Sequence, residues 1–381
     1  MTQAELLDEE EPLRRSEGRV QPYEGWKQDE GLPSYRGYGV EDLYDLELVP
    51  WESRGGSAAF VNLEGTGGFN DAYVYELEPT KSSAPVRHIY DETVFILKGR
   101  GATTVWIDGK PKQTFEWRER SFFSIPPNAY HQYHNLSGTE PMRFVAVTSA
   151  PRVINSFRSR EFIFDNPFVF RDLFDGESGY FQETQQPAGR REWSTNFVSD
   201  VMARGPVAVL GDGDDRPKTT QMSTGFVSVN QALSFSMVNS TLIAHSSSWP
   251  TATYKPAHRH GPGIHIVILA GQGYTLMWQE GRPVQRYDWR PGSFLVPPDG
   301  WFHQHFNSGA EPVMFLAIGS ENDAPRPSGE PYHIFRSTKD GGDRIFYADE
   351  DPTVHHDFEA ALAKLGVRCN MGQIHPFCTQ K

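Results

Sequence analysis

Closely spaced histidines are the residues of this chain best suited to chemistry. Two of its 13 histidines, His258 and His260, are separated by one residue, and His303 follows later in the chain. Side chains two apart in a β-strand project from the same face, so this pair can hold one ion if His303 faces it. Three neutral imidazoles leave coordination positions open, as a catalytic metal requires. We therefore expect a metal site here, and surface or hydrogen-bonded histidines are the alternative.

A second possible ligand set lies earlier in the chain and includes a carboxylate. His88, Glu92 and His131 form a combination of two histidines and one carboxylate, which suits Fe(II) or Mn(II). The alternative is a site without metal, in which Glu92 and His88 hydrogen-bond to each other. Both interpretations stay open at this point.

Residues near the three-histidine set are candidates for handling a substrate. Gln304 and His305 adjoin His303 and can donate hydrogen bonds to a bound oxygen, and Arg286 can hold a carboxylate. Other candidates for a carboxylate or for the wall of an aromatic pocket are Arg259, Arg290, Trp278, Trp301 and Phe302. For Arg259 a surface ion pair is the alternative, and for Trp278 it is the barrel core.

The elements that position these residues repeat within the chain. The segment Ser121–Asn135 (SFFSIPPNAYHQYHN) matches Ser293–Asn307 (SFLVPPDGWFHQHFN) at an offset of 172 residues. The same offset pairs Val86 with His258 and Glu92 with Ile264, so each copy lacks one ligand of the other. Short apolar runs bounded by Gly and Pro predict strands of a sandwich or barrel. A helix is predicted only near the end, over Asp357–Leu365.

These motifs resemble the two sequence motifs of the cupin superfamily. In the first copy the matching residues are His88, Glu92, Gly99, Pro126, His131 and Asn135. In the second copy they are His258, His260, Gly271, Pro298, Gly300, His303 and Asn307. The departures are Val86, Asn128 and Ile264. The resemblance covers about half of the chain and implies an all-β fold of two tandem cupin (jelly-roll β-barrel) domains with a short C-terminal helical tail.

The segment HRHGPGIHIVILAGQG resembles gentisate-type ring-cleaving dioxygenases in particular. Those bicupins hold Fe(II) on three histidines without a glutamate, and their working site usually lies in the first cupin. Here the three histidines lie in the second cupin, which is a departure from that family. Oxalate decarboxylases are bicupins that match less well, because they need His-x-His and Glu in both domains.

The resemblance implies a metal-dependent bicupin enzyme. The leading hypothesis is a non-haem Fe(II) dioxygenase that uses dioxygen to cleave a hydroxylated aromatic or related chelating small molecule. Mn(II) and Ni(II) remain possible metals, because imidazoles accept all three ions. The alternatives are a metal-dependent isomerase, lyase or decarboxylase that uses no oxygen, and a bicupin that binds a metal or small molecule without catalysis.

Composition and charge exclude several other classes of function. Lys and Arg number 36 against 49 for Asp and Glu, and the net charge of −13 argues against nucleic-acid partners and anionic membranes. No apolar run is long enough to span a bilayer, and the acidic N-terminus is unlike a secretory signal. We expect a cytoplasmic protein. A homo-oligomer is also expected, because dimerisation or wrapping arms often cover exposed edge strands.

The predicted domains follow the repeat. They are a flexible acidic arm (1–25), an N-terminal cupin (26–150), a connecting segment (151–224), a C-terminal cupin (225–325) and a C-terminal extension (326–381). The only two cysteines, Cys369 and Cys378, lie in the extension. Binding of an ion together with His375 is one interpretation, and solvent-exposed thiols in a mobile tail are the favoured one. His355 is interpreted as a surface residue at the start of a helix.

Overall fold

The computed structural model describes most of the chain outside the N-terminal arm and parts of the connecting segment. The described residues are 20–66, 68–183, 186–189, 192–203, 220–221, 227–228, 231–237, 240–261, 263–320 and 329–380. Residues 1–19 of the predicted arm and the polar loop expected near residues 211–218 lie outside them. None of the described helices has the length and apolar character needed to cross a membrane.

The N-terminal barrel consists of a large and a small β-sheet. In spatial order, the large sheet contains β1 (Ser34–Tyr35), β4 (Ser57–Val61), β5 (Asp71–Leu77), β11 (Met142–Thr148), β6 (Glu92–Lys98), β9 (Phe122–Ile125) and β14 (Phe197–Val198), and β3 (Val49–Pro50) pairs with β4. The small sheet contains β10 (Tyr130–Asn135), β7 (Arg100–Trp106) and β8 (Gln113–Arg118). A core of apolar and aromatic side chains fills the space between the two sheets.

The C-terminal barrel has the same plan. Its large sheet contains, in order, β12 (Gln186–Gly189), β13 (Glu192–Thr195), β17 (Gln231–Met237), β18 (Leu242–Trp249), β24 (Val313–Ser320), β19 (His265–Ala270), β22 (Phe294–Leu295) and β2 (Gly39–Val40). Its small sheet contains β21 (Gln285–Trp289), β20 (Gly273–Trp278) and β23 (Phe302–Asn307). A separate two-stranded pair is formed by β15 (Thr220–Gln221) and β16 (Val227–Ser228).

The two barrels match strand for strand. The central order β5-β11-β6-β9 of the first large sheet recurs as β18-β24-β19-β22 in the second, and β10-β7-β8 recurs as β23-β20-β21. At the 172-residue offset of the repeat, β10 falls onto β23 from its first residue to its last. The predicted all-β architecture of two tandem jelly-roll barrels with a short helical tail is therefore confirmed.

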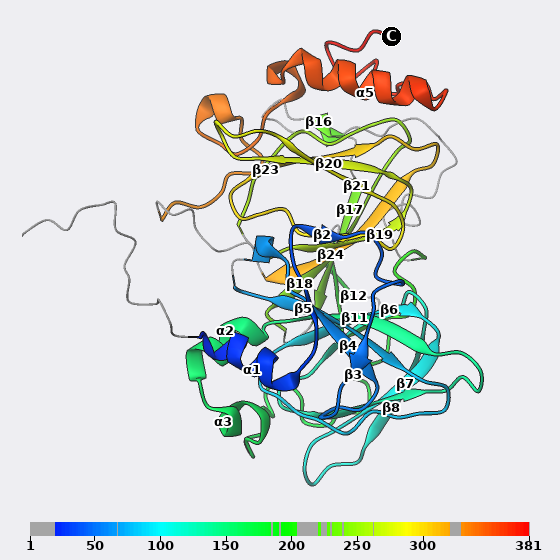
Figure 1. Cartoon of the computed structure of the whole chain (residues 1–381), viewed down its shortest axis with the longest axis vertical. Helices are drawn as coiled ribbons and strands as arrows, with labels where there is room; N and C mark the ends of the chain where they lie inside the picture. The colour runs from blue at the N-terminus through cyan, green and yellow to red at the C-terminus, as the bar shows by residue number, and fades with distance from the viewer. Residues whose placement is uncertain are drawn as a thin grey trace, which may run out of the picture.

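The barrels stack along the long axis of the molecule, with their large sheets facing each other (Figure 1). Val145 and Val147 of β11 and Leu316 and Ile318 of β24 belong to one buried cluster between these sheets. Alternation along each strand thus sends one set of side chains into its own barrel and the other set into the contact between barrels. Both faces of each large sheet are apolar, which explains the continuous hydrophobic runs in the sequence.

Short strands from other parts of the chain cover the sheet edges that β9 and β22 would otherwise expose. The connecting segment supplies β14, which pairs with β9, and the N-terminal segment supplies β2, which pairs with β22 of the opposite barrel. Unpaired strand edges promote association, so these additions remove a reason to dimerise. The strand β2 lies within the predicted N-terminal domain (26–150) but pairs with a strand of the C-terminal barrel. A segment of the first predicted domain is therefore part of the second barrel.

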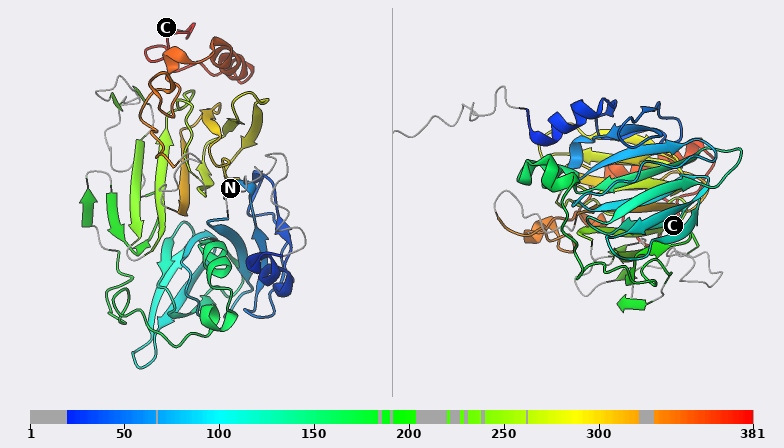
Figure 2. Two further views of the ribbon diagram at one scale, coloured as in Figure 1. Left: turned by 90° about the vertical axis from the view of Figure 1, so that its left-hand side faces the viewer. Right: turned by 90° about the horizontal axis from the view of Figure 1, so that it is seen from below.

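Helices are few and lie at the periphery. Near the N-terminal barrel are α1 (Pro22–Glu30), α2 (Ala150–Phe157) and α3 (Arg160–Phe164), and α5 (Pro352–Lys364) lies at the far end of the C-terminal barrel (Figures 1 and 2). The start of α5 precedes the predicted start at Asp357 by five residues. The missed signal is Asp351 followed by a proline: the Asp351 carboxylate accepts from the Thr353 amide, and Pro352 occupies the first turn.

Candidate metal centres

The C-terminal barrel brings His258, His260 and His303 together. The backbones of His258 and His303 exchange two hydrogen bonds of 3.1 and 2.8 Å, which places the histidine pair opposite β23. The ring centroid of His303 lies 4.4 Å from that of His258 and 4.7 Å from that of His260. One nitrogen from each ring lies within 4.8 Å of the others. The three histidines therefore converge as expected, although the structure forms only an isolated bridge at His258 where the spacing argument expected a strand.

Backbone carbonyls orient all three rings. The Nδ1 atoms of His258, His260 and His303 lie 3.2, 2.9 and 3.2 Å from the carbonyl oxygens of Pro256, Gly261 and Trp301. An Nδ1–H that donates to a carbonyl leaves the Nε2 lone pair available, which is the usual arrangement of metal-binding histidines. Burial, more than any neighbouring charge, lowers the pKa of each imidazole below its ordinary value, so the rings are neutral. The residues present therefore fit a divalent metal ion.

The register of β23 separates the candidates Gln304 and His305. Alternation places His305 on the same face as His303, with ring centroids 5.5 Å apart, and Gln304 on the opposite face. The Gln304 amide donates to Glu350 at 2.6 Å, in the C-terminal extension. The structure thus leaves His305 beside the histidine cluster, and it contradicts a direct contact of Gln304 with a ligand there.

His305 is held in place by a hydrogen bond to Thr275. Its Nδ1 lies 2.8 Å from the hydroxyl of Thr275, which also accepts the indole N–H of Trp289 at 3.0 Å. If the hydroxyl hydrogen points at Nδ1, the imidazole proton lies on Nε2. In that tautomer His305 does not ligate through Nε2 but can donate a hydrogen bond to a group bound at the cluster.

Arg286 lies outside the barrel interior. It pairs with Leu276 in β20, on the face that also carries Tyr274, and its guanidinium lies over the Tyr274 ring and bonds to Asp288. The expectation that Arg286 holds a substrate at the cluster is therefore wrong. Arg286 projects from the outer face of the small sheet, and the register of β21 on β20 sets that face. The residue type and its position in the sequence do not reveal this register.

Arg259, Trp278 and Phe302 also lie away from the cluster. Arg259 donates to Asp343 at 2.8 Å and pairs with Glu280 at 3.3 Å, as the ion-pair interpretation expects. Trp278 and Phe302 stack on each other at 5.6 Å, on the face of the small sheet that bears Gln304. These aromatic rings pack the outside of the sheet.

Lys255 is a buried lysine that sequence reasoning missed. Its Nζ lies 4.5 Å from the ring centroid of Trp249 and 4.3 Å from that of Phe315, inside the C-terminal barrel. Burial, followed by the charge of Arg344, lowers the pKa of Lys255 well below its ordinary value. No carboxylate among the described residues forms an ion pair with it. A single lysine before the His-x-His pair has no spacing that marks it, so only the fold identifies it.

The N-terminal barrel brings its predicted ligands together as well. The Nε2 atoms of His88 and His131 lie 3.3 and 3.7 Å from the two carboxylate oxygens of Glu92, and all three side chains are buried. Both Nε2 atoms and one Glu92 oxygen have no hydrogen-bond partner among the described residues. The Nδ1 of His88 is 2.9 Å from the carbonyl of Tyr90. Three unpartnered ligand atoms that converge also fit a metal ion.

Glu92 is the electrostatic centre of the N-terminal cluster. Tyr133 donates to it at 2.5 Å, and the Arg54 guanidinium lies 3.7 Å away. Burial by itself raises the pKa of Glu92, but the two imidazoles and Arg54 outweigh it and hold that pKa below its usual range. Burial lowers the pKa of His131 to about 3. The carboxylate is thus ionised and already has a permanent cation beside it.

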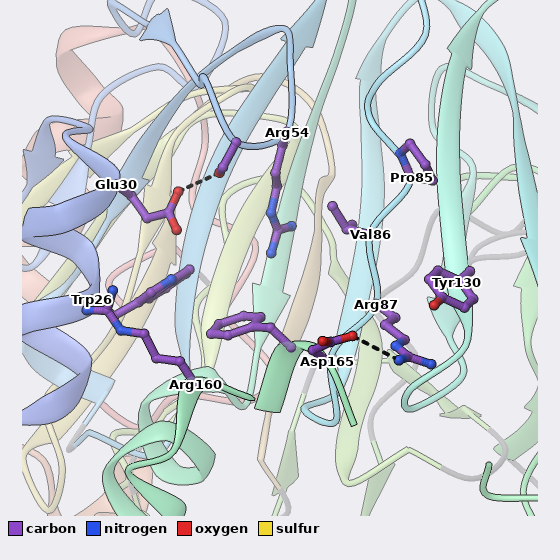
Figure 3. Close-up of a pocket in the computed structure, with 11 residues that line it drawn as sticks. Trp26, Glu30, Arg54, Pro85, Val86, Arg87, Tyr130, Arg160 and Asp165 are labelled. Carbon is purple, nitrogen blue, oxygen red and sulfur yellow. Dashed lines mark hydrogen bonds and ion pairs between the residues drawn. The ribbon is translucent and has the colours of Figure 1, made fainter. Parts of the chain in front are cut away.

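A pocket lies on the outer side of Arg54 (Figure 3). Its volume is about 370 Å³, and Trp26 of α1, Phe164 of α3 and Tyr130 of β10 contribute to its walls. Deeper in the barrel, between Arg54 and Tyr133, the free volume is only about 10 Å³, which is roughly one water molecule. The N-terminal cluster is therefore enclosed by side chains, with Arg54 lining both spaces.

A family model decides the classification of the first barrel. Residues 73–148, from within β5 to the end of β11, match the Cupin domain model. The second barrel repeats the same strand order. The chain thus has one barrel that matches the cupin family model and a second barrel with the same strand order. The motif resemblance noted in the sequence is thereby confirmed.

Similarity of the chain to individual proteins is partial. It is 35% identical over 66 residues to gentisate 1,2-dioxygenase from Ralstonia sp., and the match spans 17% of each protein. Among solved structures it is similar to oxalate decarboxylase from Bacillus subtilis, with 13% identity, a TM-score of 0.46 and coverage of 75% of this chain and 77% of that one. The Lactobacillus farciminis oxalate decarboxylase matches with 12% identity and a TM-score of 0.45, over 75% and 86% of the two chains.

Proposed function

We propose that this bicupin is a metal-dependent enzyme whose working site is the three-histidine cluster of the C-terminal barrel. The proposed reaction is the oxidative cleavage of a hydroxylated aromatic or related chelating small molecule by dioxygen, with Fe(II) held on His258, His260 and His303. One observation carries the proposal: three oriented, neutral imidazoles converge without a carboxylate. Such a set leaves the ion's charge undiminished and leaves positions for exogenous ligands.

The charge of the barrel interior points to an anionic substrate. Lys255 is buried against Trp249 and Phe315, and its desolvation opposes the charged form. A carboxylate bound beside Lys255 would reverse this effect by stabilising the ammonium ion. The same carboxylate would also balance the charge of the metal, which the three neutral histidines leave uncompensated. A hydroxy-carboxylate therefore meets both needs of the site.

The chain's own residues bind and orient in this proposal. Lys255 binds the carboxylate, and the Nε2–H of His305 donates to an oxygen of the bound substrate. The Thr275 hydroxyl, fixed by Trp289, keeps that proton on Nε2. A ferrous ion bound at the cluster would supply a common coordination sphere for substrate and dioxygen, which contributes proximity and charge stabilisation.

Metal analysis of matched double variants tests which barrel works. The protein would be purified without oxygen, and iron content and oxygen uptake would be measured over a panel of dihydroxy aromatics and hydroxy-carboxylates. We expect His260→Ala with His303→Ala to abolish oxygen uptake and to lower the iron content, because the N-terminal cluster keeps its own ligand set. The matched control, His88→Ala with His131→Ala in the N-terminal barrel, should retain oxygen uptake per folded molecule.

The reverse pattern would contradict the assignment. If the N-terminal pair abolishes turnover and the C-terminal pair does not, the working site is His88, Glu92 and His131. If wild-type protein loaded with iron or manganese binds hydroxy-carboxylates stably but neither consumes oxygen nor converts any substrate of the panel, the protein is a binding bicupin and not an enzyme.

The N-terminal cluster favours a second candidate function. Two histidines and one carboxylate suit Mn(II), and Arg54 beside Glu92 places a cation next to the cluster. This arrangement supports an isomerase, lyase or decarboxylase that uses no oxygen. The same substrate panel, assayed with and without oxygen after loading with Mn(II), separates the two candidates, because only the dioxygenase requires oxygen.

A further inference from the structure

The C-terminal extension contains a third cluster of possible metal ligands, remote in sequence from both barrel sites. His355 and Glu359 lie one turn apart on α5, and Cys369 and Cys378 lie in the segment that follows it. All four are buried, with 0% to 8% of their surface exposed, and one ligand atom of each lies within 4.8 Å of the others. The prediction of exposed thiols and of a surface His355 is therefore wrong.

The distances between the ligand atoms resemble the edges of a tetrahedron. The two sulfur atoms are 3.7 Å apart, and the Cys369 sulfur is 4.0 Å from His355 Nε2. Glu359 Oε1 is 3.4 Å from the Cys378 sulfur and 3.5 Å from His355 Nε2. Zinc bound to sulfur, nitrogen and oxygen at its usual distances gives tetrahedral edges of about 3.3 to 3.8 Å. The set therefore needs only small adjustments to surround one ion.

Hydrogen bonds orient the ligands as a metal site requires. The Nδ1 of His355 lies 2.9 Å from the Tyr254 hydroxyl, which donates to Glu350 at 2.6 Å. The tyrosine therefore accepts from Nδ1–H, and Nε2 is left with its lone pair toward the sulfurs. Glu359 is fixed by the amide and hydroxyl of Thr379, at 3.0 and 2.8 Å. The hydrogen-bonded chain from Glu350 through the Tyr254 hydroxyl to His355 is typical of the groups that orient a metal-binding histidine.

We propose that His355, Glu359, Cys369 and Cys378 bind a structural zinc ion. Four protein ligands close the coordination sphere, so the site holds no position for a substrate and acts as a clamp. The clamp ties α5 to the terminal segment, in which residues 366–380 contribute no helix or strand.

The layer that this clamp holds covers the outer face of the small sheet of the C-terminal barrel. Phe358 packs against Phe306 of β23 at 5.7 Å, and Glu350 binds Gln304 of the same strand. The zinc site thus supports, from the outside, the strand that carries His303.

Cobalt substitution of the full-length protein tests the proposal directly. Neither barrel cluster contains sulfur, so thiolate-to-cobalt charge transfer in the near ultraviolet can come only from Cys369 and Cys378. We expect this absorption, with intense tetrahedral d–d bands, at about one equivalent of cobalt per chain. It should persist in the variant with His260→Ala and His303→Ala, weaken in Cys378→Ser, and disappear in the double variant with Cys369→Ser and Cys378→Ser.

Two further measurements keep the test independent of whether Cys378→Ser folds. Tyr254→Phe removes the hydroxyl between His355 and Glu350, and we expect it to weaken zinc binding about 10- to 100-fold while the thiolate band remains. Thiol titration of denatured, unreduced protein after chelation should give two free thiols.

Either of two results would overturn the proposal. The first is cobalt-loaded wild-type protein without the thiolate band. The second is protein without free thiols, which would mean that Cys369 and Cys378 form a disulfide instead of a metal site.

Discussion

The two barrels share strand order and register but differ in what fills them. Tyr73 of β5 and Tyr133 of β10 line the N-terminal cluster, and the registers place His245 and His305 at the equivalent positions of the C-terminal barrel. Ser247 occupies the position in the C-terminal barrel that is equivalent to Tyr75. The Thr–Trp hydrogen bond beneath these residues is the same in both barrels, at 2.9 and 3.0 Å. Large rings are thus replaced by smaller polar side chains while the frame stays constant.

The difference in charge follows the difference in size. In the N-terminal barrel Glu92 and Arg54 balance each other within the protein. In the C-terminal barrel Ile264 replaces the carboxylate, and the buried cation Lys255 has no ion-pair partner among the described residues. A sealed and neutralised cluster is typical of a structural site. A cluster that lacks negative charge suits an anionic ligand, and this contrast supports the proposal that the C-terminal barrel is the binding site.

The largest expected effect concerns stability of the N-terminal barrel. Glu92→Gln removes the negative charge that compensates buried Arg54, and loss of one partner from a buried ion pair costs about 3 kcal/mol of unfolding free energy. Urea unfolding would measure this cost. Oxygen uptake per folded molecule should be unchanged. If turnover falls while stability is retained, the roles of the two barrels are reversed.

The next effect concerns the cation of the C-terminal barrel. Lys255→Met keeps the length of the side chain and removes its charge, so KM for an anionic substrate should rise about 10- to 100-fold, as expected for a hydrogen bond to a charged group. The variant should also unfold at a higher temperature, because a desolvated cation is replaced by an apolar side chain. A lower melting temperature with unchanged KM would show that Lys255 serves the fold and not the substrate.

A smaller effect concerns pH and the contact between the barrels. His265 stacks on Phe294 with both ring nitrogens unpartnered among the described residues, and burial lowers its pKa to about 3. Between about pH 6.5 and pH 3, His265 binds a proton in the unfolded chain but stays neutral in the folded protein. Stability is therefore lost as pH falls, with a slope of about 1.4 kcal/mol per pH unit. In His265→Leu the slope of urea-derived stability against pH should decrease by one proton; an unchanged slope would refute the assignment.

The smallest effect is expected at Arg286. Arg286→Ala removes an exposed side chain that contacts Asp288 and Tyr274 on the outside of β20. We expect kcat/KM within about twofold of the wild-type value and a change in unfolding free energy below about 0.5 kcal/mol. A larger loss of kcat/KM, measured by steady-state oxygen uptake, would show that Arg286 contributes to substrate binding or turnover.

Several features could be predicted because they depend on local pattern. Apolar runs between Gly and Pro identify strands, and the repeat identifies two copies of one barrel. The pair His258 and His260 and the trio His88, Glu92 and His131 could be selected because strand alternation and side-chain type are properties of the chain. Gln304 does not face the cluster because neighbouring residues of a strand project from opposite faces of the sheet. Arg286 does not face it because the register of β21 on β20 sets its face, and single residues do not reveal that register.

The sequence by itself determined the strands, their duplication and the histidines that converge in each barrel. The tertiary structure decided which charges meet. Lys255 enters the C-terminal barrel, Arg54 reaches Glu92 from a distant loop, and Cys369 and Cys378 approach α5 through a turn of the terminal segment. Long-range contacts of this kind depend on how sheets pack and on where the chain returns, and no local spacing encodes them. Burial then sets their chemistry, because a charge or a thiol acquires its properties from the groups that replace water around it.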